Sequence, residues 1–480
     1  MTKKMLQFVG VEQSMPEKRS ANDRRQDFDE IYRDFAVQAA ELQASRCSQC
    51  GVPYCQVHCP LNNNIPDWLK LVAENRMEEA YEVSAATNNM PEICGRICPQ
   101  DRLCEGNCVI EQAGHGTVTI GSVEKHITET AFDNGWVKPV VPLAERDESV
   151  AIIGAGPAGM AAAEQLRKQG IQVTIYDRYD RAGGLLIYGI PGFKLEKHVV
   201  QRRQTHLEDS GVHFELNTEI GKDISFFELR AKHDAVLIAT GVYKARDLTL
   251  PGSGHDNIVP ALDYLTASNR VGLGDTVPAF ADGSLNAAGK NVVVIGGGDT
   301  AMDCVRTAVR QGATAVSCVY RRDEANMPGS AREVANAKEE GVTFEWLAAP
   351  TGFDGGSENQ VTALRAVRMQ LSVADESGRQ SVTPVADSQF TIKADLAIQA
   401  LGFEPEDLPK AFGAKELPVS RWGTIKVSWR NMMTDLDGVF AAGDIVRGAS
   451  LVVWGVRDGR DAAAGILDYL NAQSMPEAAE

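Results

Sequence analysis

A glycine-rich motif that follows an apolar segment constrains the fold of this chain more than any other sequence feature. Gly154, Gly156 and Gly159 come directly after the largely apolar residues 149–153 and open a run of helix formers. In a dinucleotide-binding unit the first glycine makes the turn, the second lets a pyrophosphate approach, and the third lets the helix pack on the strand. The pyrophosphate faces the unpaired N–H groups of the helix N-terminus. Asp177, about 20 residues further on, would accept hydrogen bonds from a ribose.

A second copy of this motif lies in the later half of the chain. Gly296, Gly298 and Ala301 follow another apolar segment, with alanine in the third position. The strand expected after it ends in Arg321 and Arg322 instead of an acid. An acid would repel a 2′-phosphate, whereas arginine pairs with it, so this motif predicts an NADPH site. The alternative is a solvated basic pair at the end of a strand.

The two motifs head a structural repeat. Residues 234–241 and 395–402 are both apolar strands that end in glycine, one after each motif. Together these features predict two mononucleotide-type α/β folds in tandem. A further apolar strand closed by Gly-Asp at 437–444, and a helical pattern over 450–469, follow the second fold. Position alone does not say which fold includes this tail.

The N-terminal region is rich in cysteine. Of the ten cysteines, Cys304 and Cys318 lie in apolar stretches and are expected to be buried and uninvolved. The remaining eight form two runs, which are Cys47-x2-Cys50-x4-Cys55-x3-Cys59 followed by Pro60, and Cys94-x3-Cys98-Pro99-x4-Cys104-x3-Cys108.

Three chemistries compete for these eight thiols. Disulfides need an oxidising compartment, and zinc sites usually come as two close pairs separated by a spacer. Runs of four cysteines that end in Cys-Pro are closer to the ferredoxin type, in which the fourth cysteine binds a different iron–sulfur cluster. The favoured prediction is two [4Fe–4S] clusters that share ligands between the runs, although a carboxylate such as Glu124 could replace one thiolate. Residues 65–84 have apolar side chains at helical spacing, so a helical domain is expected around the clusters.

The net charge of the chain limits the kinds of partner that it can bind. Lys+Arg is 48 and Asp+Glu is 65, which gives a net charge of −17 and argues against nucleic acid or an anionic membrane as the main partner. No apolar run is long enough for a membrane-spanning helix, and because no apolar segment follows the basic first residues, no signal peptide is expected. A cytoplasmic location is therefore expected.

The paired motifs resemble the pyridine-nucleotide-disulfide reductase type of flavoprotein. The resemblance implies that the first motif binds FAD and that the NADPH domain is inserted into the FAD domain. Gly443 and Asp444 match the late motif of that family, whose acid holds the flavin ribityl chain, and Gly183 and Gly184 match its Gly-Gly segment. The Cys-x4-Cys redox pair of the disulfide reductases is missing after the first motif. Electrons are therefore expected to leave by another route.

With its cysteine runs, the chain resembles, nearly end to end, the small (beta) subunits of bacterial NADPH-dependent glutamate synthases. Residues 47–60, 91–108 and 183–196 carry this resemblance most specifically. It implies FAD, NADPH and two [4Fe–4S] clusters as cofactors. A hydride from NADPH would reduce FAD, and single electrons would then pass through the clusters. They would reach the FMN of a large (alpha) subunit that forms L-glutamate from L-glutamine and 2-oxoglutarate. The alternatives are an NADPH:ferredoxin-type oxidoreductase with another partner and a scaffold whose clusters are only structural.

The N-terminal half of dihydropyrimidine dehydrogenase is similar too, and this resemblance implies the cluster ligands. One cluster would take Cys47, Cys50, Cys55 and Cys108. The other would take Cys59, Cys98 and Cys104. Its fourth ligand in dihydropyrimidine dehydrogenase is a glutamine, whose position here is Glu124, which leaves the role of Cys94 open.

The expected architecture is an all-α iron–sulfur domain followed by two Rossmann-like α/β domains, one inserted in the other. The expected boundaries are 1–145 for the helical domain, 146–285 with 420–480 for the FAD domain, and 286–419 for the NADPH domain.

Overall fold

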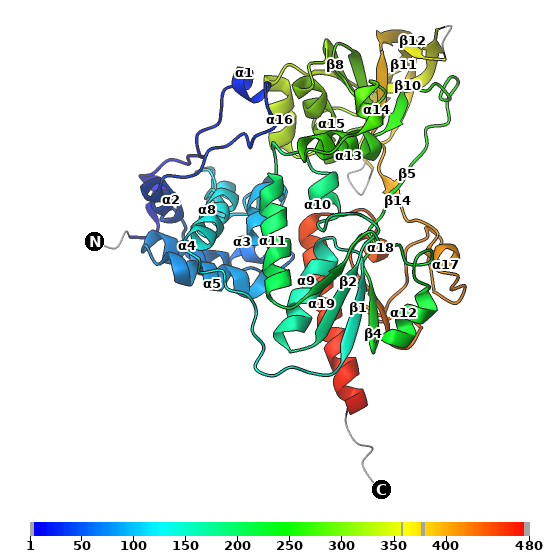
Figure 1. Cartoon of the computed structure of the whole chain (residues 1–480). Helices are drawn as coiled ribbons and strands as arrows, with labels where there is room; N and C mark the ends of the chain where they lie inside the picture. Colours follow the sequence, from blue (N-terminus) through cyan, green and yellow to red (C-terminus); the bar gives the residue numbers. More distant parts are fainter. Residues whose placement is uncertain (1–3, 357–358, 376–379, 475–480) are drawn as a thin grey trace.

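The computed structural model describes residues 4–356, 359–375 and 380–474, which form a helical part and two α/β domains (Figure 1). The helical part lies beside both α/β domains, and the C-terminal helix runs along the first of them. Within the described residues, no helix is both long and apolar enough to cross a membrane.

The helical part, as far as the structure describes it, extends from residue 4 to residue 133. Its elements are η1 (Gln7–Val9), α1 (Ala21–Arg24), α2 (Val37–Ala44), α3 (Tyr54–Val57), α4 (Ile65–Ala73), α5 (Met77–Thr87), α6 (Pro91–Ile97), η2 (Gln100–Arg102), α7 (Val109–Gln112) and α8 (Ile120–Asp133). The helical pattern over 65–84 thus folds as two helices instead of one. Asn75 adopts a φ of 59°, in the left-handed region, and ends the first of them.

The first α/β domain is built on a parallel five-stranded sheet with strand order β15-β4-β1-β2-β3. Its strands are β1 (Ser149–Ile153), β2 (Gln172–Tyr176), β3 (His213–Glu215), β4 (Ala235–Ile238) and β15 (Val439–Ala441). Its helices are α9 (Pro157–Lys168), α10 (Leu185–Tyr188), α11 (Lys197–Asp209), α12 (Phe226–Lys232), α17 (Leu408–Ala411), α18 (Asp444–Arg447) and α19 (Val452–Ser474).

The C-terminal tail belongs to this first domain. β15 pairs with β4, and α19 packs along α9. The fit is close, since a Cβ at Gly459 of α19 would overlap the carbonyl oxygen of Ala158 in α9. The chain therefore leaves the first domain after β4 and returns to complete it with β15 and α19.

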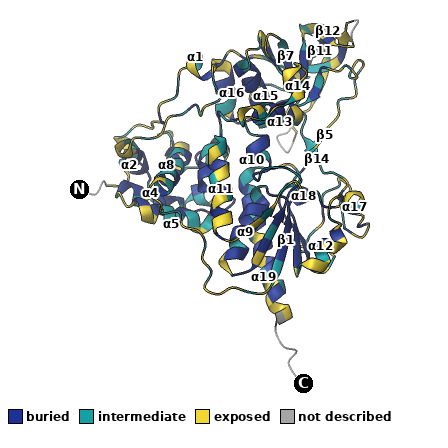
Figure 2. Ribbon diagram, viewed as in Figure 1, coloured by how far each residue is buried: buried dark blue, intermediate teal, exposed yellow. Residues whose placement is uncertain are grey.

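The second α/β domain also has a parallel five-stranded sheet, with strand order β6-β13-β7-β8-β9. Its elements are β6 (Ile258–Pro260), α13 (Ala261–Gly272), α14 (Pro278–Ala281), β7 (Asn291–Ile295), α15 (Asp299–Arg310), β8 (Ala315–Tyr320), α16 (Ala331–Glu339), β9 (Thr343–Trp346) and β13 (Leu396–Gln399). An antiparallel sheet is attached to it, formed by β10 (Ala348–Gly355), β11 (Val361–Leu371) and β12 (Val382–Lys393). In both domains the central sheet strands are buried, the edge strands β3 and β9 are not, and the outer helix faces are exposed (Figure 2).

The structure differs from the expected domain boundaries at both crossings between the α/β domains. β6 pairs with β13 and α13 packs against α15, so residues 258–285 lie with the second sheet and not the first. α17 and Phe412 pack in the core of the first domain, although the sequence analysis placed them in the second. A three-residue strand such as β6 gives no periodic signal, which explains the difference. The antiparallel ribbon of β5 (Lys244–Ala245) and β14 (Phe403–Glu404) marks the two crossings.

The N-terminal segment reaches across to the second domain, where α1 lies beside α16 (Figure 1). Arg24 is fully buried there, and its guanidinium pairs with the fully buried carboxylate of Glu340, with Nε 3.2 Å from Oε1. Glu340 also accepts hydrogen bonds from Arg306 and Arg310 of α15. Charges buried this deeply are tolerated because they are paired. The contact joins the N-terminal segment and the second α/β domain.

Candidate functional site

The first glycine loop lies between β1 and α9, at the carboxyl edge of its sheet. Gly154 has a φ of +112°, and a Cβ there would overlap the carbonyl oxygen of Ala239 on the neighbouring strand. A Cβ at Gly159 would overlap the carbonyl oxygen of Gly154, so α9 can approach the loop closely. Gly156, in contrast, faces open space, where a pyrophosphate could approach the N-terminus of α9.

Asp177 follows β2, next to this loop. Its carboxylate accepts hydrogen bonds from the backbone N–H groups of Ala155 (2.7 Å) and Tyr179 (2.9 Å). Burial raises the pKa of Asp177, and these two bonds oppose the shift. The Asp177 carboxylate thus holds the glycine loop through its bond to Ala155. It also lines the adjoining cavity.

Two cavities meet at the carboxyl edge of the first sheet. They share Gly154, Asp177, Thr240 and Tyr243, so they adjoin, and we describe them together as the nucleotide channel. The channel brings together six of the eight residues predicted for the first nucleotide, which are Gly154, Gly156, Asp177, Gly184, Gly443 and Asp444. The other two, Gly159 and Gly183, pack behind it, and the N–H of Gly183 donates to the carbonyl of Ala155 (2.8 Å).

Polar groups in this channel fit an extended dinucleotide. Thr240 lines both cavities. Its hydroxyl group is buried and has no hydrogen-bond partner among the described residues. Burial raises the pKa of Asp444 to about 7. A dinucleotide with its pyrophosphate at Gly156 would extend from Asp177 towards Asp444, and its hydroxyl groups would supply the missing partners.

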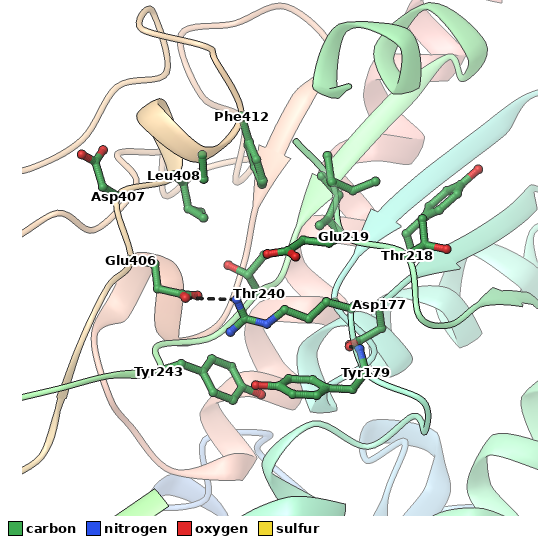
Figure 3. A pocket seen from close by; sticks show the side chains of 16 residues that line it. Asp177, Tyr179, Thr218, Glu219, Thr240, Tyr243, Glu406, Asp407, Leu408 and Phe412 are labelled. Atoms are coloured by element: carbon green, nitrogen blue, oxygen red, sulfur yellow. Dashed lines mark hydrogen bonds and ion pairs between the residues drawn. The ribbon is translucent and has the colours of Figure 1, made fainter. Parts of the chain in front are cut away.

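Four side chains that line the first of these cavities were not anticipated from the sequence, and Figure 3 labels three of them, Tyr179, Tyr243 and Glu406. Arg178 donates to Glu406 (3.0 Å) and lies over the rings of Tyr179 and Tyr243, 5.3 and 5.0 Å from their centroids. Glu406 comes from the segment that returns from the second domain. No local motif links residues so far apart in the sequence, so only the position of Arg178 beside Asp177 could have drawn attention to them.

The second glycine loop repeats this geometry between β7 and α15. Gly296 has a φ of +149°, and a Cβ there would overlap the carbonyl oxygen of Ala400. Gly298 faces open space at the N-terminus of α15, and Ala301 is fully buried in that helix. Gly297 was not singled out from the sequence, yet a Cβ there would overlap the ring of Tyr320.

Arg321 and Arg322 directly follow β8, which is the neighbour of β7, so they lie at the same sheet edge as the second glycine loop. Arg321 is exposed and Arg322 is half-buried. The Nε of Arg322 is buried and has no hydrogen-bond partner among the described residues. An anion bound at this edge, such as a 2′-phosphate, would supply one.

The first set of predicted cluster ligands gathers near the surface of the helical part. Cys55 lies close enough to Cys108, Cys47 and Cys50 for their charges to add to the effect of burial, which raises the pKa of Cys55 to about 12. Two N–H groups of Gln49 point at the Cys47 sulfur, both at 3.4 Å. Hydrogen bonds of this kind tune the potential of an iron–sulfur cluster.

The second set surrounds a small cavity. Its lining includes Cys59, Cys94, Cys98, Cys104 and Glu124, which are the three predicted ligands and both candidates for the fourth position. Among the described residues, no three His, Cys, Asp or Glu side chains converge as they would around a single metal ion. A four-iron cluster instead occupies the space between its thiolates, so a cavity ringed by cysteines fits this group.

Glu124 faces this cavity with two amide partners. Its Oε1 accepts hydrogen bonds from Asn63 (3.3 Å) and Asn88 (3.2 Å), and burial raises the pKa of Glu124 to about 8. The Cys94 thiol donates weakly to Asn88 (3.8 Å) and lies against Cys98. Both candidates therefore reach the cavity, and the identity of the fourth ligand stays a prediction.

Two single substitutions would identify that ligand. If Glu124 completes the cluster, as the resemblance to dihydropyrimidine dehydrogenase implies, Glu124→Ala should reduce the iron content from about eight to about four per chain. Cys94→Ala should then leave about eight, because the thiol is a bystander. Iron and acid-labile sulfide analysis measures both, and the reverse result would assign the ligand to Cys94.

One turn of α19 separates the second cysteine cavity from the nucleotide channel. Val453 lines the cysteine cavity, whereas the adjacent Val452 lines the channel, as do Asp444 and Gly156. Arg457, one turn later, donates to the carbonyl oxygen of Pro60 (2.8 Å), the residue that follows Cys59. The helical part is thus fixed to the first α/β domain where the two candidate cofactor sites come closest.

Family models and solved structures agree with this architecture. Residues 24–136 match the model of dihydropyrimidine dehydrogenase domain II, 4Fe-4S cluster, and residues 148–459 match that of pyridine nucleotide-disulphide oxidoreductases. Among solved structures, Mycobacterium tuberculosis FprA in complex with NADPH has a TM-score of 0.58 and 21% identity, over 69% of this chain and 88% of that one. Lactococcus lactis thioredoxin reductase has a TM-score of 0.50 and 21% identity, over 68% of this chain and 100% of that one. The chain is therefore an oxidoreductase of the pyridine nucleotide-disulphide class that carries a 4Fe–4S domain.

Curated relatives narrow the class to a family. The glutamate synthase [NADPH] small chain of Azospirillum brasilense is 68% identical, over 98% of this chain and 97% of that one. The small chain of Escherichia coli is 42% identical, over 98% and 100%. A further Escherichia coli protein, AegA, is named only as an oxidoreductase and is 44% identical, over 96% and 70%. This chain belongs to the family of glutamate synthase [NADPH] small chains.

Proposed function

We propose that this chain is the NADPH-oxidising, electron-entry subunit of a glutamate synthase, working in the cytoplasm with a large subunit. When bound, FAD would accept a hydride from NADPH, and two [4Fe–4S] clusters would pass single electrons on to the FMN of the large subunit, which forms L-glutamate from L-glutamine and 2-oxoglutarate. The residues of this chain hold and orient these groups, exclude water and separate the sites. No side-chain acid or base is assigned to the hydride step.

One observation carries this proposal, namely the placement of Val452 and Val453 on either side of the first turn of α19. A flavin in the channel and a cluster in the cysteine cavity would both lie beside this turn. Cys104 lies close enough to Cys55 for their charges to interact, so the second cysteine set adjoins the first. The order nucleotide channel, second set, first set supports a path for electrons out of the flavoprotein.

Three exposed apolar side chains lie close in the sequence to Cys55, a predicted ligand at the end of this path. Val52, Tyr54 and Val57 are 62%, 51% and 59% exposed, and they surround Cys55 in the sequence. Apolar side chains exposed together are common at sites of protein association. The family name implies a large subunit, and we assign this surface to it.

The experiment that tests the proposal combines the purified chain with the large subunit. The chain alone should oxidise NADPH with an artificial electron acceptor and form no glutamate. Addition of the large subunit should give NADPH-dependent glutamate. Glutamate formed from NADPH by this chain alone would contradict the assignment.

The relative named only as an oxidoreductase favours a second candidate, an NADPH:ferredoxin-type oxidoreductase that serves another partner. Co-purification from the native source separates the two functions. A large glutamine-hydrolysing chain that co-purifies in a fixed ratio supports the glutamate synthase assignment. A ferredoxin or another electron acceptor in its place supports the second candidate.

A further inference from the structure

The segment that leads into α16 touches the second glycine loop. The N–H of Gly329 donates to the carbonyl oxygen of Gly297 (2.9 Å), and the N–H of Ser330 donates to the Asp299 carboxylate (2.9 Å). Asp299 is the first residue of α15 and follows Gly298, the glycine that faces open space. Any phosphate bound at this loop would therefore lie beside the Asp299–Ser330 contact.

The opposite side of the same segment touches the loop that carries the second cysteine set. Asp101 accepts hydrogen bonds from the Ser330 hydroxyl and the Ala331 N–H, both at 3.3 Å. Arg102 donates to the carbonyl oxygen of Pro328 (2.5 Å). Ser330 is only 6% exposed, so a single buried serine links Asp299 at the glycine loop to Asp101 on the loop between Cys98 and Cys104.

Arg332 extends the contact to the cysteine cavity. It donates to the Gln100 side chain (3.1 Å) and pairs with Glu105 (2.8 Å). Gln100 lines the cavity and donates to the carbonyl oxygen of Cys94 (3.2 Å). Glu105 is buried beside Cys104, and its charge acts on that thiol.

The residues on the cysteine side of this contact are closely packed. A Cβ at Gly121 would overlap the Gln100 amide, and a Cβ at Gly106 would overlap the carbonyl oxygen of Asp101. The Glu105 carboxylate is fixed from behind by the N–H of Gly121 (3.1 Å). A displacement of Ser330 or Arg332 would therefore be passed on to the groups around the cavity, because close-packed atoms cannot absorb it locally.

We propose that Asp101, Ser330 and Arg332 couple the nucleotide loop to the second cysteine cavity, so that nucleotide binding and the redox state of the cluster held there affect each other. The inference rests on the proposed function, since it requires both groups to be bound. A phosphate at Gly298 adds negative charge beside Asp299 and acts on its bond to Ser330. The charges of Arg332 and Glu105 then shift relative to the cluster, whose potential depends on nearby charges and hydrogen bonds. The effect is reciprocal by linkage.

The probe is 2′-phospho-ADP-ribose, which has the phosphates of NADPH but no nicotinamide and so cannot exchange a hydride. Its dissociation constant is measured by calorimetry on the full-length protein with flavin and clusters, both oxidised and reduced with dithionite. We expect the two constants to differ by roughly fivefold or more, the lower end of usual coupling between sites. A fivefold difference corresponds to a shift of about 41 mV in the cluster midpoint potential, at 59 mV per tenfold for one electron. Potentiometric EPR with and without the probe measures that shift.

Two variants and one matched control locate the coupling. Asp101→Asn removes the charge opposite Ser330, and Arg332→Gln removes the ion pair with Glu105. In both, the two dissociation constants should agree within about twofold, and Arg332→Lys should restore part of the difference. Glu324→Gln breaks an exposed ion pair between Glu324 and Lys338 of α16. This pair does not include Asp101, Ser330 or Arg332, so the variant should keep the full difference.

The outcomes separate this coupling from the proposed function. A cluster signal that is the same with and without the probe in the unaltered protein would overturn the coupling alone. A shift that persists at full size in both Asp101→Asn and Arg332→Gln would also overturn it, since the effect would then travel through the flavin. If the protein shows no cluster signal at all, the proposed function fails, and the coupling fails with it.

Discussion

Replacing Cys47 with serine should abolish NADPH-dependent glutamate formation by the complex with the large subunit. The thiolate is one of the four predicted ligands of the first cluster, so the iron content should fall from about eight to about four per chain. Reduction of the flavin by NADPH should stay within about twofold of the unaltered protein, because the channel lies on the far side of the second cysteine set. Stopped-flow absorbance measures the flavin, and amino-acid analysis measures glutamate.

Cys304→Ser is the matched control, because Cys304 is fully buried in α15 and is expected to bind no metal. It should keep about eight irons, about eight acid-labile sulfides and full glutamate formation. A zinc content near two per chain without sulfide, in the unaltered protein, would contradict the iron–sulfur assignment altogether.

Replacing Arg321 and Arg322 together with alanine should weaken NADPH binding by roughly 10²-fold. A charge-assisted hydrogen bond to a phosphate contributes roughly 1.5–3 kcal/mol. We take the lower value for both residues because Arg321 is exposed, which gives about 3 kcal/mol in total. NADH has no 2′-phosphate, so its affinity should change by no more than about twofold. Titration of the flavoprotein with each nucleotide measures the two constants.

Arg365→Ala is the control for this pair. Arg365 is a half-exposed arginine in the same domain that pairs with Asp354, away from the second glycine loop. Its replacement should leave both nucleotide affinities unchanged. If the Arg321/Arg322 variant loses NADPH and NADH equally, these arginines do not bind the 2′-phosphate.

The local motifs of this chain could be predicted from sequence because each residue has a role that depends on its near neighbours. Gly154 and Gly296 both adopt positive φ and adjoin a carbonyl of the next strand, as a glycine loop requires. Arg178 and Glu406 could not be paired in this way, because they are distant in the sequence and only the return of the chain from the second domain brings them together.

The cysteine region shows the same division. The runs predicted a helical iron–sulfur domain, and the matching family model confirms a 4Fe–4S domain. The contact of Asp101 with Ser330, in contrast, depends on how separate domains pack. The sequence around Asp101 and around Ser330 does not indicate this contact, since a lone aspartate and a lone serine carry no motif.

The late return of the chain has a consequence for how the protein is made on the ribosome. β4 ends at Ile238, and β15, which pairs with it, begins only at Val439. At roughly 5–20 residues per second, about 10–40 s of synthesis separate the two strands. During that time the inserted domain can fold completely, whereas the first glycine loop still lacks the strand and helix that finish its channel. We therefore expect the flavin to join the first domain only after translation has reached α19, so cofactor loading would be one of the last steps of assembly.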